Sequence, residues 1–252
     1  MTGTATTPPW LTARPIAHRG LHDRTVGVPE NTMAAAEAAI RAGYAIECDV
    51  QISADGEAMV FHDEALGRLT AAEAKVSALS AAALSGLAVA GTQERIPTLP
   101  AFLATIAGRT PLIVEIKSRF SGDLALTRRV AAIVSAYDGP VALKSFDPGL
   151  VAALHDLAPG TPRGLVGETR QDDPSYALMT ETQRRSLSNL LHLSESRPDF
   201  LSWRVDDLQS APPYLCRLLG RMPVMTWTVR TPDQRALAQA QADQMVFEGF
   251  LP

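Results

Sequence analysis

The stretch that decides the fold is Ala45-Ile46-Glu47-Cys48-Asp49-Val50, a short β-rich segment with two charged side chains inside it. In an extended strand successive side chains point to opposite faces, so Glu47 and Asp49 share one face and Cys48 takes the other. Two like charges on a buried face are very unfavourable without a cation. The segment therefore predicts a strand whose carboxylates converge at a polar site and whose other face packs against helices.

Similar β-rich segments alternate with Ala- and Leu-rich helical ones along the 252 residues. The strand candidates are residues 16–19, 45–50, 112–117, 141–146, 163–167, 200–205, 224–229 and 244–248. The helical candidates include residues 32–42, 99–106, 124–137, 148–157 and 233–240. Repeated βα units of this number predict a (β/α)8 TIM barrel, whose active site lies at the C-terminal ends of the strands.

One region interrupts the alternation. Residues 59–62 predict a strand that the turn Ala54-Asp55-Gly56 joins to residues 45–50, and we expect this arm to fold back over the barrel mouth. Residues 63–97 are too long for a plain βα loop and predict a small insertion. A helical excursion packed on the rim is favoured over a lid or a membrane-facing patch. A single domain over residues 1–252 is expected.

The composition excludes several classes of partner. The chain has 23 Lys and Arg against 27 Asp and Glu, a net charge of −4, which gives no electrostatic reason to expect nucleic acid or an anionic membrane. Cys48 and Cys216 form neither a disulfide framework nor a metal-binding pair. Because no secretory signal and no apolar run of about 20 residues is present, a cytoplasmic protein without a membrane span is expected.

A third carboxylate lies at the end of another predicted strand. Residues 112–117 end in Glu115-Ile116-Lys117, which again places two charged side chains on one face. Glu47, Asp49 and Glu115 together offer the hard oxygen ligands that Mg²⁺ or Ca²⁺ prefers, so one divalent cation is predicted. The alternative is that the carboxylates form salt bridges with Arg19 and Lys117 and bind no metal.

Two histidines complete the candidate site. His18 ends residues 16–19 and His62 ends the arm. Their near-neutral pKa values suit them to take a proton on one side of a reacting centre and return one on the other. Arg19 and Lys117 can hold an anion that a divalent cation also coordinates, and phosphate is the commonest substrate group that uses all of these.

Other polar and aromatic residues have more than one interpretation. Glu30 and Asn31 are expected to cap the helix that follows them. Glu168 and Glu248 end predicted strands, where they either reach the mouth or form salt bridges. Trp227 lies late in a strand, where packing and a substrate role are equally expected.

Ordered sequence blocks relate the chain to a known family. The blocks are Ala17-His18-Arg19-Gly20, Pro29-Glu30-Asn31-Thr32, Glu47-Cys48-Asp49-Val50, Asp55-Gly56, His62-Asp63, Leu66-Gly67-Arg68-Leu69-Thr70, Ile96-Pro97-Thr98-Leu99, Glu115-Ile116-Lys117, Ser145-Phe146-Asp147 and Trp227-Thr228-Val229. With these blocks the sequence resembles the glycerophosphodiester phosphodiesterases. Each block alone is weak, but together they follow the family's order and cover most of the chain.

The resemblance implies a (β/α)8 barrel of the phospholipase C-like phosphodiesterase type, with a small insertion after the second strand. It implies hydrolysis of glycerophosphodiesters to sn-glycerol 3-phosphate and an alcohol. By the family pattern, His18 and His62 are the acid and base, Glu47, Asp49 and Glu115 bind the divalent cation, Arg19 and Lys117 contact the phosphate, and Trp227 forms a wall of the pocket. The chain departs from the family's usual Asp-Pro ending with Phe247-Glu248-Gly249-Phe250.

Two further functions compete with hydrolysis of a small, water-soluble glycerophosphodiester. A lysophospholipase D-type enzyme would use the same chemistry on a lipid, and residues 63–97 should then form a wide apolar groove. A non-catalytic barrel that binds phosphate-containing ligands has no need for paired proton-transfer groups, so His18 and His62 argue against it.

Overall fold

The structure, a computed structural model, describes residues 7–171, 176 and 179–252. Its strands are β1 Ile16–Ala17, β2 Ala45–Ile52, β3 Ala58–Val60, β4 Leu112–Ile116, β5 Val141–Ser145, β6 Arg163–Gly167, β7 Phe200–Arg204, β8 Val224–Val229 and β9 Gln244–Phe247. All but β3 are parallel, in the order β1-β9-β8-β7-β6-β5-β4-β2, and a further pairing of β1 with β2 closes the barrel. The predicted (β/α)8 barrel is confirmed within this described part of the chain.

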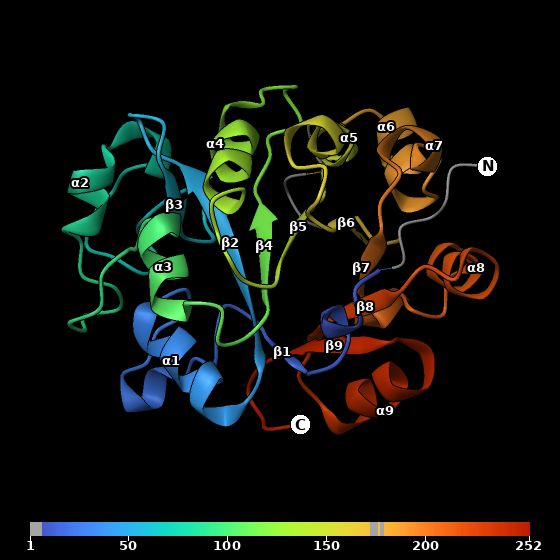
Figure 1. Cartoon of the computed structure of the whole chain (residues 1–252), viewed down its shortest axis with the longest axis horizontal. Helices are drawn as coiled ribbons and strands as arrows, with labels where there is room; N and C mark the ends of the chain where they lie inside the picture. The colour runs from blue at the N-terminus through green and yellow to red at the C-terminus, as the bar shows by residue number, and fades with distance from the viewer. Residues whose placement is uncertain (1–6, 172–175, 177–178) are drawn as a thin grey trace.

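Helices surround the strands on the outside (Figure 1). They are α1 Met33–Ala42, α2 Ala81–Ser85, α3 Leu99–Ile106, α4 Ala125–Val134, α5 Pro148–Leu157, α6 Glu181–Ser188, α7 Leu193–Ser196, α8 Ala211–Gly220 and α9 Pro232–Gln241. Several begin at a side chain that accepts a backbone N–H, such as Thr32, Thr98, Asp147 and Thr231. In the described segments, no helix combines the length and apolar character needed to cross a membrane.

The barrel interior changes from apolar to charged along the strands. At the amino end, Leu11 packs among inward-facing residues that form one cluster with it, namely Ile16, Ala45, Ile113, Ala142, Phe200, Met225 and Val246. Two residues further along β2, β4 and β5, the same face carries Glu47, Glu115 and Lys144. The polar side chains are thus placed toward the carboxyl ends of the strands, as in other barrels of this class.

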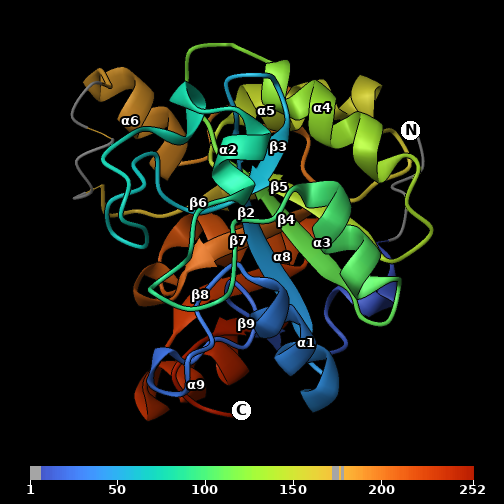
Figure 2. The same cartoon turned by 90° about the vertical axis from the view of Figure 1, so that its left-hand side faces the viewer.

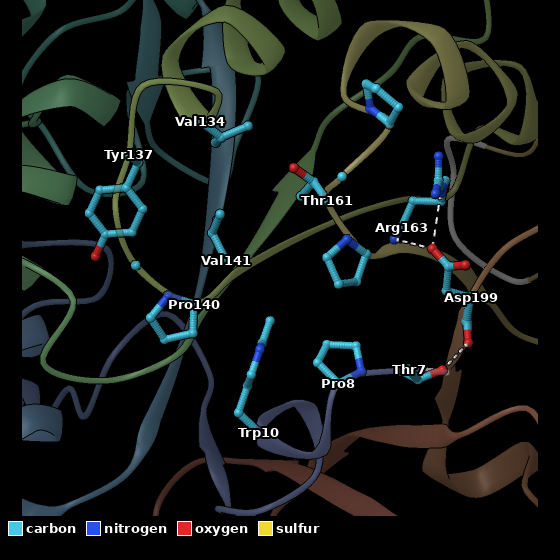
Figure 3. Close-up of a pocket in the computed structure, with 14 residues that line it drawn as sticks. Thr7, Pro8, Trp10, Val134, Tyr137, Pro140, Val141, Thr161, Arg163 and Asp199 are labelled. Carbon is cyan, nitrogen blue, oxygen red and sulfur yellow. Dashed lines mark hydrogen bonds and ion pairs between the residues drawn. The ribbon is translucent and has the colours of Figure 1, made fainter. Parts of the chain in front are cut away.

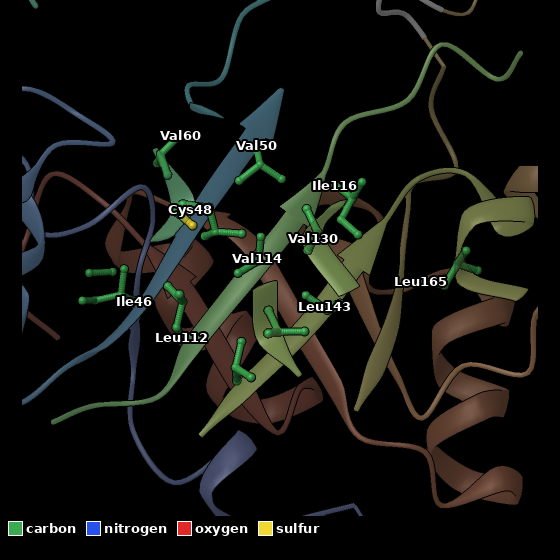
Figure 4. Close-up of a cluster of buried hydrophobic side chains, with 14 of the residues drawn as sticks. Ile46, Cys48, Val50, Val60, Leu112, Val114, Ile116, Val130, Leu143 and Leu165 are labelled. Carbon is green, nitrogen blue, oxygen red and sulfur yellow. The ribbon is translucent and has the colours of Figure 1, made fainter. Parts of the chain in front are cut away.

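The opposite face of each strand is apolar and meets the helices (Figure 4). Cys48 is fully buried between Ile46 and Val50 in a large cluster that includes Val114 of β4 and Val130 of α4. This arrangement confirms the predicted alternation in residues 45–50. Its packing fixes the direction of Glu47 and Asp49, because a one-residue shift would bury both charges against the helices.

The insertion has its own small core. β3 pairs antiparallel with β2, with Val50 opposite Val60, and so brings His62 to the carboxyl end of the barrel. Figure 2 shows the teal chain of residues 63–97 around α2, beside β3. Its apolar side chains pack inward in one cluster with β3, including Met59, Phe61, Leu66, Leu69, Val76, Leu84, Val89 and Ile96. The expected helical excursion is wrong for most of these residues, because α2 supplies only five of them, a 3₁₀ turn supplies Val76–Ala78, and most of the remainder forms turns, bends and isolated bridges.

A cavity of about 460 Å³ lies at the amino end of the barrel, away from the charged layer (Figure 3). Pro8 and Trp10 line one side, and Val141 and Arg163, which begin β5 and β6, line the other. Its charged side chains satisfy each other, because Arg163 Nε lies 3.0 Å from Asp199 Oδ2. We therefore place the candidate functional site at the other end.

The turn after β1 requires a glycine. β1 has only two residues, shorter than the predicted 16–19, because Arg19 and Gly20 both have positive φ, at 56° and 78°. A Cβ on Gly20 would lie 2.8 Å from the Cβ of Ala35 on α1. The close approach of this turn to α1 therefore depends on the missing side chain.

Replacing Gly20 with Ala should destabilise the fold more than replacing Gly43 with Ala. Both glycines have φ of 78°, but nothing lies within 4 Å of a Cβ at Gly43. Gly43→Ala should cost about 1–2 kcal/mol of unfolding free energy from backbone strain alone. Gly20→Ala should cost about 1–3 kcal/mol more from overpacking. Equal losses in denaturant titrations of the two variants would contradict the proposed close packing.

Candidate active site

Three carboxylates meet at the centre of the barrel mouth. Glu47 and Asp49 come from β2 and Glu115 from β4, where Asp49 and Glu115 are direct partners in the register. Ligand atoms of all three lie within 4.8 Å of one another, and all three residues are at least 95% buried. The structure brings together the set predicted from residues 45–50 and 112–117.

Positive side chains lie among these carboxylates. Lys117 Nζ is 2.7 Å from Asp49 Oδ1 and 2.5 Å from Glu115 Oε1. Lys144 Nζ lies below, 3.1 Å from Glu47 Oε1 and 3.3 Å from Glu115 Oε2. Arg19 Nε is 3.4 Å from Asp49 Oδ2. Among the described residues, three cationic side chains therefore contact three acidic ones, and the buried cluster is close to neutral.

The positive charges keep Asp49 and Glu115 ionised. Burial alone would raise the pKa of Asp49, but nearby positive charges, Lys117 foremost, outweigh it and hold this pKa well below its usual value. Burial likewise opposes ionisation of Glu115, whose pKa is lowered by Lys117 and Lys144. Glu47 and Glu115 in turn raise the pKa of Lys144 despite its burial. All of these groups therefore carry their full charge at neutral pH.

The backbone at Arg19 turns its groups toward this cluster. With φ of 56°, Arg19 donates its N–H to Glu47 Oε2 at 3.0 Å, while its guanidinium Nη1 lies 2.5 Å from Glu30 Oε1. Its Nε is buried and makes no hydrogen bond of good geometry to any described residue. A buried donor without an acceptor is costly, so this atom marks a position where an anion would be stabilised.

Each predicted histidine has a carboxylate on Nδ1. His18 Nδ1 is 2.5 Å from Glu248 Oε2, and His62 Nδ1 is 2.7 Å from Asp63 Oδ1. Both imidazoles lie close enough to Asp49 to contribute to lowering its pKa. The two histidines, which are 44 residues apart in the chain, therefore both lie near one carboxylate cluster.

A family comparison accounts for these residues together. The model of the glycerophosphoryl diester phosphodiesterase family matches residues 18–248, a range that starts at His18 and ends at Glu248.

The chain belongs to this family.

A glycerophosphodiester phosphodiesterase of Caldanaerobacter subterraneus subsp. tengcongensis is 32% identical over 163 residues, 60% of this chain and 65% of that protein. Among solved structures, a glycerophosphodiester phosphodiesterase from Thermotoga maritima is 24% identical and has a TM-score of 0.69, covering 92% of each chain. An Oleispira antarctica phosphodiesterase, solved in complex with the product sn-glycerol-3-phosphate, is 22% identical with a TM-score of 0.73, covering 92% of this chain and 91% of that one. These two likenesses support the barrel fold.

In this phosphodiesterase, Glu30 and Asn31 do not have the helix-capping role that was expected of them. Thr32 caps α1, because its side chain accepts the N–H of Ala35. Asn31 has φ of 57° and donates from Nδ2 to Asp49 Oδ2 at 3.0 Å. The prediction of capping was therefore wrong: Asn31 orients a carboxylate of the buried cluster instead.

Glu30 connects the two sides of the site. It accepts from Arg19 on one side and, at 2.7 Å, from Arg68 Nη2 on the other. Arg68 also contacts Asp63, the partner of His62. Although burial would raise the pKa of Glu30, the hydrogen bonds from these arginines lower it to about 2. A continuous chain of ion pairs thus runs from the turn after β1 to the arm.

The wall opposite the carboxylates is aromatic. Trp227 of β8 is half-buried at the mouth, and its ring packs edge-on against Phe146 with centroids 5.5 Å apart. Its Nε1 donates to Ser202 O at 2.9 Å, which fixes the ring plane. Glu168 directly follows β6 and forms an ion pair with Arg204, with Oε2 2.9 Å from Nη1, as one of its two expected roles.

Sequence reasoning did not single out Lys144. Residues 141–146 were expected to be a strand, and the period of two places Lys144 on the same face as Ala142 and Phe146, which is the barrel interior. A buried lysine in a central strand is rare unless it has a charged partner. The inward position of Lys144 in the strand alternation could therefore have indicated that it pairs with the carboxylates.

Lys144→Met should destabilise the phosphodiesterase strongly. The substitution keeps most of the side-chain volume but leaves two buried carboxylates without their shared cation, which typically costs about 3–5 kcal/mol. The exposed Lys75, whose Nζ is 2.9 Å from Glu64, provides the matched control, and Lys75→Met should cost less than about 1 kcal/mol. Urea titrations of both variants measure the difference, and similar midpoints would show that Lys144 is not needed to neutralise the cluster.

Proposed function

We propose that this phosphodiesterase hydrolyses small glycerophosphodiesters to sn-glycerol 3-phosphate and an alcohol, using one divalent cation and two histidines. The observation that carries the proposal is that His18 and His62 both lie beside the buried cluster of Glu47, Asp49 and Glu115. A binding protein would have no use for two proton-transfer groups beside such a cluster.

The donor set fits a hard divalent cation. Glu47, Asp49 and Glu115 supply only oxygen atoms, and their proximity matches the ligand preference of Mg²⁺ and Ca²⁺. When bound, such an ion would polarise the phosphate oxygens and add positive charge. Lys144 lies on the inner side of the cluster and Lys117 on the open side, where a fifth of its side chain is exposed.

Arg19 and Lys117 are proposed to bind the phosphate group. The Arg19 Nε lacks a hydrogen-bond acceptor among the described residues, and the Lys117 ammonium lies at the open side of the cluster. Positive groups fixed around a phosphate stabilise the extra negative charge that develops during its hydrolysis. Trp227 is proposed to contact the glycerol or the leaving alcohol from the opposite wall.

His18 and His62 are proposed to move the protons. Each has a carboxylate on Nδ1, so Nε2 is the nitrogen available to the substrate. One imidazole takes the proton of the attacking hydroxyl or water, and the other gives a proton to the oxygen of the leaving alcohol. His62 is the more accessible, with 32% of its side chain exposed, whereas His18 is buried, with 10% exposed.

A small substrate is favoured over a lipid. The large apolar side chains of residues 63–97, all of which the structure describes, are packed into the insertion's own core instead of lining a groove. The sn-glycerol-3-phosphate bound to the Oleispira antarctica phosphodiesterase is the product expected here. We therefore propose deacylated headgroup esters, such as glycerophosphocholine or glycerophosphoethanolamine, as substrates of a cytoplasmic enzyme.

Release of sn-glycerol 3-phosphate should be measured over a panel of glycerophospho-alcohols and lysophosphatidylcholine, with and without a chelator. We expect release from the water-soluble esters, loss with chelator, and recovery when Mg²⁺ or Ca²⁺ is added. A kcat/KM for lysophosphatidylcholine well above that for glycerophosphocholine would contradict the substrate assignment. Activity that survives exhaustive chelation, with no metal found by elemental analysis, would favour the salt-bridged alternative.

Variants of the carboxylates add a control to this assay. Asp49→Asn should abolish binding of the divalent cation in calorimetry, because it removes a charged ligand. Glu37→Gln changes a carboxylate that pairs with Arg109 outside the site and should bind the cation like the wild type. Equal cation affinities of the two variants would exclude Asp49 as a ligand.

Replacing either histidine should abolish most turnover without unfolding the protein. His18→Ala and His62→Ala should each lower kcat by about 10²- to 10⁴-fold, the usual contribution of a general acid or base. His155→Ala is the control, since His155 contacts only the backbone oxygens of Ser196 and Arg197 among described residues. Near-normal kcat in the His18 or His62 variant would assign that histidine a structural role.

A further inference from the structure

His18 is the first member of a row of three polar groups at the closing seam of the barrel. Its Nδ1 lies 2.5 Å from Glu248 Oε2, and the other oxygen of Glu248, Oε1, accepts from Arg230 Nε at 2.6 Å. His22 Nε2 approaches Oε2 at 3.6 Å. Glu248 thus uses both oxygens, one for the imidazole and one for the guanidinium.

The barrel register fixes this contact. Ala17 of β1 pairs with Phe247 of β9, so the next residue on each strand, His18 and Glu248, leave the barrel side by side. His18 donates its backbone N–H to Phe247 O at 3.0 Å. Glu248 donates its backbone N–H to Val229 O at 3.1 Å, which connects Glu248 to β8. The two side chains meet because the strands leave them no other relative position.

Aromatic packing holds the segment that carries Glu248. The ring of Phe247 lies 5.0 Å from that of Tyr44 and 5.6 Å from that of Phe250, measured between centroids. Gly249 between them has φ of 80°, which lets the chain turn directly after Glu248. The segment that departs from the usual family ending is therefore packed so that it holds the Glu248 carboxylate in place.

We propose that Glu248, held by Arg230, is the positioning residue of His18: it accepts a hydrogen bond from the Nδ1–H and leaves Nε2 free to exchange protons with the substrate. The proposal rests on the catalytic role of His18 under Proposed function and extends it to residues outside the family blocks. A carboxylate on the far nitrogen of an imidazole selects the tautomer and stabilises the imidazolium that forms when Nε2 takes a proton.

Glu248 remains charged in this position. Burial by itself would raise its pKa, but the hydrogen bonds from His18 and Arg230, together with the nearby His22 ring, lower it far below the usual value. The His18 side chain therefore contacts an ionised carboxylate, which is the form that accepts a hydrogen bond from the Nδ1–H.

The second histidine has the same surroundings. His62 Nδ1 contacts Asp63 Oδ1, and Asp63 Oδ2 accepts from Arg68 Nε at 2.5 Å. Each imidazole of the site thus has a carboxylate on Nδ1 and an arginine behind that carboxylate. The two groups of histidine, carboxylate and arginine come from different parts of the chain. That both have the same order supports the same role for each carboxylate, which is to orient Nε2 of its histidine.

The test compares Glu248→Gln with a matched glutamate that has no histidine partner. Glu57 Oε2 lies 2.7 Å from Arg129 Nη2, and its side chain is 23% exposed against 21% for Glu248. Glu57→Gln therefore removes an arginine-paired carboxylate of similar burial. Glu248→Asp serves as the conservative variant. The measurements are kcat and KM for a glycerophosphodiester, and the His18 tautomer from ¹⁵N NMR of histidine-labelled protein.

We expect wild-type His18 to carry its proton on Nδ1 and Glu248→Gln to shift it toward Nε2. Glu248→Gln should lower kcat by about 10- to 100-fold with KM changed less than about threefold. Glu248→Asp should recover part of the loss, and Glu57→Gln should match the wild type. The proposal is overturned if wild-type His18 carries its proton on Nε2, or if Glu248→Gln lowers kcat no more than Glu57→Gln.

The outcomes separate this proposal from the proposed function. If His18→Ala keeps its turnover, the catalytic role of His18 fails whatever Glu248 does. If His18→Ala loses turnover while Glu248→Gln does not, only the positioning role fails. The tautomer is read without substrate, so it tests the contact even where turnover is too low to measure.

Discussion

Mutual repulsion of Glu47, Asp49 and Glu115 is the constraint on which the rest of the site depends. Burying three negative charges within a few ångströms is affordable only beside positive ones. Lys144 supplies charge from inside the barrel, and Lys117 and Arg19 supply it from the mouth. The two residues that neutralise the cluster from the mouth are therefore also the ones that we propose to bind the phosphate group.

The ion pairs extend outward from this cluster in two directions. One path runs through Arg19, Glu30 and Arg68 to Asp63 and His62. The other side is shorter, from His18 to Glu248 and Arg230. Because Glu30 and Glu248 each contact charged partners on both sides, their orientations are set by several contacts at once. Such mutual restraint is what a preorganised site requires.

Features that depend on the local periodicity of the sequence could be predicted from the sequence alone. The alternation in residues 45–50 predicted the inward carboxylates and the outward Cys48, and strand β6 and helices α3 and α5 have the predicted bounds. Long-range pairing was beyond reach, because nothing local to Glu248 indicates that its neighbour is His18. Asn31 was assigned to a helix cap for the same reason: its partner, Asp49, lies in another strand.

The seam between β1 and β9 makes the site depend on both ends of the matched segment. His18 and Glu248 are 230 residues apart, so their contact closes a loop that contains all the strands from β2 to β8. Closing so long a loop has an entropic cost, and contacts between residues distant in the chain slow folding. On the ribosome, the strands from β2 to β8 emerge before β9, the last side of the site. Catalytic competence would then report that synthesis has passed residue 248 and that the barrel has closed.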